Sequence, residues 1–131
     1  MKRRDLVLGL VAVALGCAVL AYHGPGRPFI RGHVGDAAAT MFVFAVLGLT
    51  SWRLRTRAVV TLAFAFSIEL GQLVWTSIGT SGAGALILGS VFDPWDLVAY
   101  VVGVAVALTY HRLHDDRREV PGQRRRVEAA R

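Results

Sequence analysis

A long stretch of this chain carries no basic residue, and that feature constrains the fold more than any other. From Ala58 to Tyr110 there is no Lys or Arg, and the only charged residues are Glu69, Asp93 and Asp96. The 15 Lys and Arg are grouped in short clusters between apolar runs. A soluble domain of 131 residues cannot bury four such runs, so the pattern predicts a polytopic membrane protein.

The apolar runs predict an all-α fold, in which residues 1–110 form one membrane-embedded four-helix bundle. Each run approaches the ~20 residues that a helix needs to span a bilayer. Asp93 followed by Pro94 is typical of an N-cap and a first helical residue. The four helices are expected at about 6–22, 36–52, 58–78 and 94–112.

The sequence predicts the structure of three further segments less completely. Residues 83–91 are apolar but too short to span, and an interfacial helix, a re-entrant piece and an extension of the last helix all stay open. Residues 113–131 predict a basic, partly disordered tail. The first run follows a basic segment as in a signal peptide or, at Cys17, a lipoprotein, but the residues after Ala21 form a poor processing site. We therefore expect a retained first helix.

The distribution of basic residues orients the bundle. Three lie before the first helix, three lie between the second and third, and seven lie in residues 111–131, whereas the opposite side has only Arg27 and Arg31. The positive-inside rule then places both termini in the cytoplasm of a multi-pass plasma-membrane protein. The basic clusters are expected to contact anionic lipids, and no nucleic-acid partner is expected.

This orientation brings the scarce polar residues of the bundle to one depth, near the outer leaflet. Asp36 begins the second predicted helix. Glu69 and Gln72 are three residues apart and share one helix face, and the same spacing relates Asp93 to Asp96. Because a carboxylate inside a membrane is costly unless it is paired or hydrated, these residues are candidates for a functional site.

Each member also has a simpler interpretation. Asp36, Asp93 and Asp96 are typical of helix caps, and Glu69 with Gln72 is typical of a polar contact between helices. The arginines of the outer loop, Arg27 and Arg31, fit lipid head groups as well as they fit a site. The two outer histidines, His23 and His33, match no strong metal-binding spacing, so neither a metal nor a cofactor is predicted.

Three segments resemble an uncharacterised bacterial membrane family, domain of unknown function 2809, which is similar to the broader VanZ-like group. They are Arg-Gly-His-Val-Gly-Asp at 31–36, Phe-Ser-Ile-Glu-Leu-Gly-Gln-Leu at 66–73, and the segment at 88–103 that contains Asp-Pro-Trp-Asp. The resemblance implies a Glu-x-x-Gln helix followed by an Asp-x-x-Asp segment. The family often has an Arg-rich stretch between these motifs, but residues 76–91 contain no basic residue here. If that stretch balances the acids in the family, either Arg27 or Arg31 takes its place here or the site is more acidic.

The polar residues and the resemblance together predict a protein of the cell envelope that binds or modifies an amphiphile at the outer leaflet. Carboxyl groups with general acid or base roles would suit a rearrangement or cyclisation of a hydrophobic substrate. The candidate catalytic residues are Glu69, Asp96, Asp93 and Asp36. The candidate substrate-binding residues are Gln72, Arg27, Arg31, Trp75 and Tyr100.

Two other classes of function fit the same residues. A non-enzymatic structural or interaction subunit would use the polar cluster to lock helices together or to meet a partner. An oligomeric ion or proton pathway would use the acids as relay groups. Gly71 and Gly103 are expected to let neighbouring helices approach closely in each case.

Overall fold

A computed structural model describes residues 3–77 and 93–128 of the chain. Every regular element in these ranges is helical, which confirms the predicted all-α fold. The predicted short segment at 83–91 lies outside the described residues. The elements are α1 (Arg3–Ala21), α2 (Arg27–Phe29), the π-helix η1 (Ile30–Val34), α3 (Gly35–Val46), the 3₁₀ turn η2 (Leu47–Leu49), α4 (Leu54–Ser77) and α6 (Pro94–Glu128).

Three stretches of helix are long and apolar enough to cross a membrane: Arg3–Ala21, Arg27–Leu49 and Pro94–Asp115. The second of these joins α2, η1, α3 and η2 into one nearly continuous rod. The fourth long helix, α4, is not among these candidates within the described residues, although the sequence predicted it as a span. The protein is therefore a helical membrane protein, and the side on which its termini lie stays a prediction.

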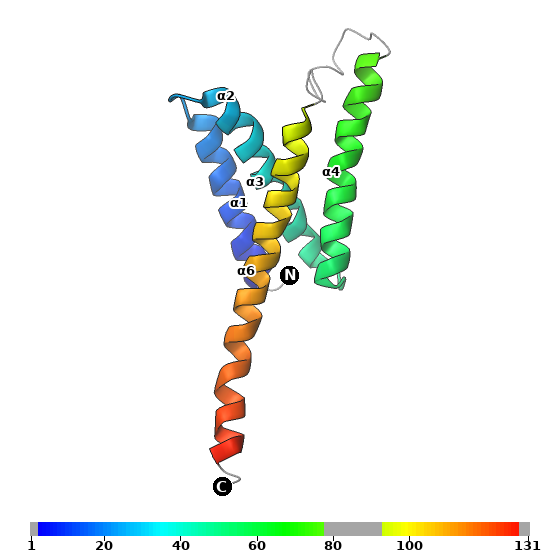
Figure 1. Cartoon of the computed structure of the whole chain (residues 1–131). Coiled ribbons are helices and arrows are strands. Elements are labelled where there is room, and N and C mark those ends of the chain that lie inside the picture. Colours follow the sequence, from blue (N-terminus) through cyan, green and yellow to red (C-terminus); the bar gives the residue numbers. More distant parts are fainter. Residues whose placement is uncertain (1–2, 78–92, 129–131) are drawn as a thin grey trace.

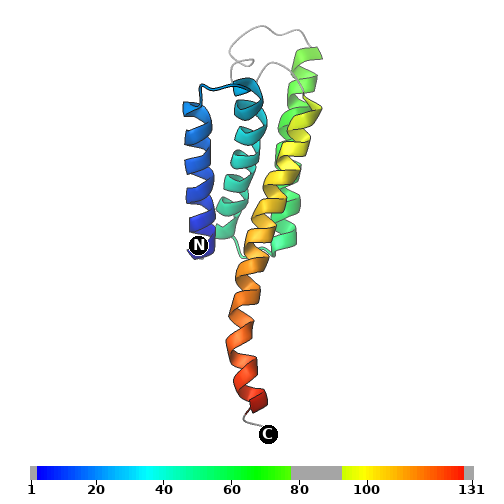
Figure 2. The same cartoon turned by 60° about the vertical axis from the view of Figure 1, so that its left-hand side comes forward.

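The helices pack around α3, which contacts α1, α4 and α6 (Figures 1 and 2). The shared core is built mostly from small side chains, which allow close helix packing in a membrane. Its buried members are Leu8, Ala12, Met41, Phe44, Ala45, Ala58, Val104 and Ala107. Large apolar side chains such as Leu10, Leu20 and Val59 remain exposed on the outside, as expected of a surface that faces lipid.

Gly103 sets the distance between α3 and α6. A Cβ added at this position would lie only 2.5 Å from the carbonyl oxygen of Ala37, so the close approach requires glycine. The prediction for Gly103 is therefore confirmed. Gly71 is different, because an added Cβ there meets no atom within 4 Å. The prediction that Gly71 mediates a close helix contact was wrong among the described residues.

The helix boundaries differ from the predicted ones at two places. The second helix begins at Arg27 rather than near residue 36, after a turn in which Gly26 adopts a φ of 71°. The last helix does not end near residue 112 but continues to Glu128, so that α6 extends beyond the rest of the bundle (Figure 1). Proline at the first turn of α2 helps to start the earlier helix. The many residues with high helix propensity in the basic tail are compatible with the longer α6.

Candidate functional site

Polar side chains from three helices meet at one end of the bundle, which we call the acidic end. It is formed by η1 and the start of α3, the later part of α4 and the start of α6. The residues that define it are His33, Asp36, Glu69, Asp93, Asp96 and Tyr100. The sequence predicted that the four acids would lie together, and the structure places all of them at this end.

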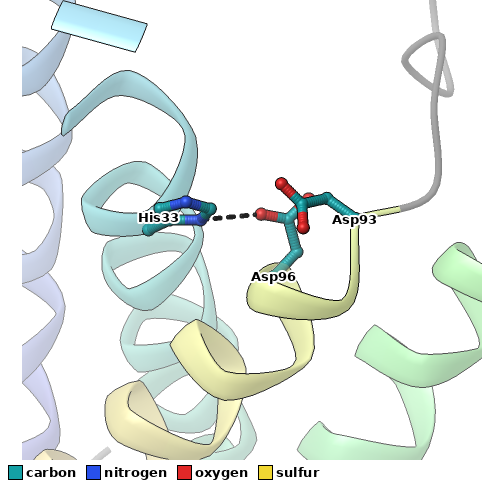
Figure 3. Close-up of side chains that lie close together, drawn as sticks. All are labelled: His33, Asp93 and Asp96. Carbon is teal, nitrogen blue, oxygen red and sulfur yellow. Dashed lines mark hydrogen bonds and ion pairs between the residues drawn. The ribbon is translucent and has the colours of Figure 1, made fainter. Parts of the chain in front are cut away.

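His33 and Asp96 link η1 to α6 (Figure 3). The Nδ1 atom of His33 lies 3.0 Å from Oδ1 of Asp96, and both side chains are about one-fifth exposed. With a proton on Nδ1, the imidazole donates this hydrogen bond and its Nε2 is left as an acceptor. The π-helical turn that contains His33 is rare in proteins and is frequent at functional sites.

Asp93 has two neighbours in the same place. Its Oδ1 accepts a hydrogen bond of 2.9 Å from the backbone N–H of Trp95, so the side chain caps α6 as the sequence predicted. Its carboxylate also lies beside the carboxylate of Asp96 and the imidazole of His33, with one ligand atom from each of the three within 4.8 Å of the others. Because carboxylate and imidazole are common ligands of divalent cations, these three residues could hold one.

Asp36 extends the cluster across the interface between α3 and α6. Its carboxyl group lies close enough to those of Asp96 and Glu69 for their charges to interact. Asp96 therefore lies near both Asp36 and His33, which the facing helix segment carries.

Glu69 is the most deeply buried acid of the cluster, with 1% of its surface exposed. Its Oε1 accepts a hydrogen bond of 2.6 Å from the hydroxyl group of Tyr100, which joins α4 to α6. Its Oε2 is buried and has no hydrogen-bond partner among the described residues. A buried acceptor without a partner is costly, and a second donor or a ligand would relieve that cost.

Two cavities adjoin the cluster. One has a volume of about 270 Å³ and lies between α3 and α4, with Asp36, Gln72 and Tyr100 among its lining residues. The other is larger, about 530 Å³, and is lined almost entirely by apolar side chains of α3 and α6, including Met41 and Val102. His33 lines this second cavity, which we call the apolar groove.

The predicted basic residues do not join the acids in the described structure. Arg27 is exposed on α2, and Arg31 lines a separate groove between α1 and α3. The partners of two of these acids are instead uncharged or weakly basic side chains: His33 lies beside Asp96, and Tyr100 lies beside Glu69. The structure describes the helix that carries Trp75 but not the placement of its side chain, so its predicted binding role stays a prediction.

A second polar cluster, which the sequence did not predict, lies at the opposite end of α3. Asp5 is 1% exposed and accepts a hydrogen bond of 2.7 Å from Nη2 of Arg57. His111 lies beside the same carboxylate, with its Nε2 3.2 Å from Oδ1 of Asp5. We call this the basic end. The sequence pattern that could have indicated this cluster is that Arg57 directly precedes an apolar run and His111 directly follows one.

Arg57 makes two further contacts at the basic end. The same Nη2 donates to the backbone carbonyl of Phe44 at 2.7 Å, and the guanidinium carbon lies 4.4 Å from the centre of the Phe44 ring. Gly48 leaves the space in which the Asp5 side chain sits, because an added Cβ would collide with it. The cluster therefore ties α1, α3, α4 and α6 together, whereas the sequence predicted basic clusters at the membrane surface.

Comparison with known proteins adds a family assignment. No solved structure matches the chain. A family described as a protein of unknown function (DUF2809) matches residues 26–104, which include the whole acidic end and Arg57. The match covers more than half of the chain and contains the three segments on which the resemblance was based. The chain therefore belongs to the DUF2809 family.

Proposed function

We propose that this protein binds an amphiphilic molecule in the plasma membrane, with the head group at the acidic end and the hydrocarbon part in the apolar groove. One observation carries the proposal: His33 is hydrogen-bonded to Asp96 and also lines the apolar groove. A single side chain thus joins a polar cluster to a cavity of about 530 Å³, within the ~300–1,000 Å³ range of small-molecule sites.

The charge of the acidic end selects the class of head group. Four carboxyl groups face one imidazole, and the nearby arginines contact none of them in the described structure. This balance supports a head group that carries positive charge or donates hydrogen bonds, such as an amine or a set of hydroxyl groups. A phosphate or carboxylate head group, for which Arg27 and Arg31 were the predicted partners, would meet net negative charge instead.

The positive-inside rule supports placing this site in the outer leaflet. The acidic end lies on the side of the bundle opposite to Arg3 and Arg4, which begin α1. An outward-facing site would receive substrates or ligands from the cell envelope. We therefore retain both cytoplasmic termini as part of the proposal.

The same site has groups suited to proton transfer. An imidazole whose Nδ1 is held by a carboxylate is a common arrangement for a general base, because the carboxylate fixes the tautomer and stabilises the protonated ring. Here Asp96 holds Nδ1 of His33, and Glu69 supplies a second buried carboxyl group. We propose acid–base chemistry on the bound amphiphile as the reaction class if the protein is an enzyme.

A photocrosslinking experiment tests the binding proposal. The full-length protein in nanodiscs is irradiated with two probes of equal chain length, a diazirine-bearing alkylamine and the matching alkyl phosphate, in the presence of a chelator. We expect the amine to label groove residues such as Met41 and Val102, with competition by unlabelled alkylamine, and the phosphate to label them much less. Equal labelling by both probes would contradict the proposed head-group selectivity.

Variants separate this function from a purely structural role. Asp96→Asn and His33→Ala should lower amine labelling at least ~10-fold while the protein remains folded, as expected when a charged contact is lost. His114→Ala is the matched control, because His114 is an exposed histidine outside the acidic end. If both variants kept full labelling but lost thermal stability, the cluster would be a helix contact. Proton flux in liposomes that is lost in Asp96→Asn would instead support the ion pathway.

A further inference from the structure

The basic end contains a polar cavity that the proposed function does not use. Its volume is about 320 Å³, and it lies where the start of α1, the turn before α4 and the middle of α6 meet. Its lining includes three arginines, one histidine and two acids: Arg4, Arg53, Arg57, His111, Asp5 and Asp115. Charged side chains thus line much of this cavity, whereas apolar side chains line the apolar groove.

One buried nitrogen atom of a residue that lines the cavity, Nε of Arg57, has no hydrogen-bond partner among the described residues. The Arg57 side chain is only 6% exposed, and the residue is part of the cavity lining. The Nη2 atom of Arg57 is already bound to Asp5 and to the Phe44 carbonyl, and Nε–H is a buried donor without an acceptor among the described residues. An acceptor from a ligand would satisfy it.

The charge balance of the lining favours an anion. Arg57 is paired with Asp5, and Arg4 is paired with Asp115. Arg53 has no ion pair in the described part of the chain, so it is the cation in excess. An anion in the cavity would contact Arg53 and the unmatched donor of Arg57 without breaking either existing pair.

We propose that the cavity at the basic end binds a phosphate group. A phosphate offers several oxygen acceptors in a tetrahedral arrangement, which suits arginine donors that approach from different helices. Both lipid head groups and soluble phosphate compounds carry this group. The site is independent of the acidic end, from which it is separated by the length of α3.

Binding is measured on the full-length protein purified in a phosphate-free maltoside detergent. One arm titrates inorganic phosphate, and the other adds phosphatidic acid or, as a head-group control, a lipid analogue without phosphate. Native mass spectrometry counts the bound molecules, and the thermal midpoint reports stabilisation. Binding of inorganic phosphate assigns a soluble ligand, and binding of phosphatidic acid alone assigns a lipid head group. Binding of neither overturns the proposal.

The decisive variant is Arg53→Gln, with Arg55→Gln as its matched control. Both arginines are exposed and two residues apart, but only Arg53 lines the cavity. Arg53→Gln should weaken phosphate binding about tenfold, as expected for one charge-assisted hydrogen bond, and Arg55→Gln should weaken it less than about twofold. Equal losses in the two variants would show nonspecific attraction and overturn the site. Asp96→Asn should bind phosphate as the wild type does, which keeps this test separate from the proposed function.

Discussion

The buried charged side chains have different kinds of partner at the two ends of the bundle. At the basic end Asp5 is matched by Arg57, which also contacts a carbonyl group and an aromatic ring. At the acidic end carboxyl groups gather beside a single histidine, and the buried oxygen Oε2 of Glu69 has no partner in the described structure. The Asp5–Arg57 pair is balanced in charge, and the carboxyl groups of the acidic end are not.

This difference separates a structural role from a functional one. A matched buried pair can serve folding alone, because its charges already satisfy each other. An unmatched group of acids gains little for folding and is stabilised only when a proton, a cation or a hydrogen-bond donor enters. We therefore expect substitutions in the buried Asp5–Arg57 pair to change stability, and substitutions at the acidic end to change binding.

The largest effect is expected from breaking the matched pair. Arg57→Gln leaves Asp5 buried without its partner and should lower the free energy of unfolding by about 3–5 kcal/mol, measured by SDS titration in mixed micelles. The double variant Asp5→Asn with Arg57→Gln should recover part of that loss, since the isolated charge is removed. Arg55→Gln should have almost no effect, because Arg55 is exposed. Near-wild-type stability of Arg57→Gln would show that the pair does not hold the bundle together.

The next effect concerns Gly103, which lies between the two ends and sets the spacing of α3 and α6 for both. Gly103→Ala would press a methyl group against the Ala37 carbonyl and should cost about 1–3 kcal/mol in the same assay. Gly71→Ala is the control, because its added Cβ meets open space and alanine has the better helix propensity. Equal stability of the two variants would argue against the close contact.

A smaller loss is expected from Tyr100→Phe at the acidic end. This variant removes the hydroxyl group that donates to Glu69 and keeps the aromatic ring, so it should lower the free energy of unfolding by about 1 kcal/mol. Tyr110→Phe serves as the comparison on the same helix, since no hydrogen bond of its hydroxyl group is described. A loss as large as that of Arg57→Gln would remove the proposed contrast between the two ends.

The smallest stability effect is expected from Asp36→Asn. Removing one of several neighbouring negative charges should change the free energy of unfolding by less than about 1 kcal/mol, because lost attraction is offset by relieved repulsion. The same variant should clearly reduce photolabelling by the alkylamine probe. Unchanged labelling together with a large loss of stability would show that Asp36 stabilises the helix packing and does not take part in binding.

Much of the fold and part of the site followed from the sequence. Long apolar runs dictate helices in a membrane, and the Asp93-Pro94 pair marks the start of α6 because a carboxylate cap and a proline each suit a first turn. Asp36 and Glu69 were expected near the start of that helix because helix length fixes which residues reach one depth.

The partners of these acids could not be predicted in the same way. His33 reaches Asp96 through an irregular turn that helical periodicity does not reveal. Asp5 and His111 stand at the edges of apolar runs, where charged and polar residues ordinarily contact water or head groups. Their burial depends on how α1, α3 and α6 pack, which is information from tertiary structure rather than local sequence.

The π-helical turn at Ile30–Val34 has a consequence for how the family can vary. Such a turn accommodates about one extra residue in a helix and rotates the residues before it by roughly 100° relative to the residues after it. The direction in which the His33 side chain points is therefore independent of which face of α3 packs against the neighbouring helices. Insertion or loss of one residue here would turn the imidazole in another direction while leaving the bundle intact, so the polar cluster can change without a change in the core.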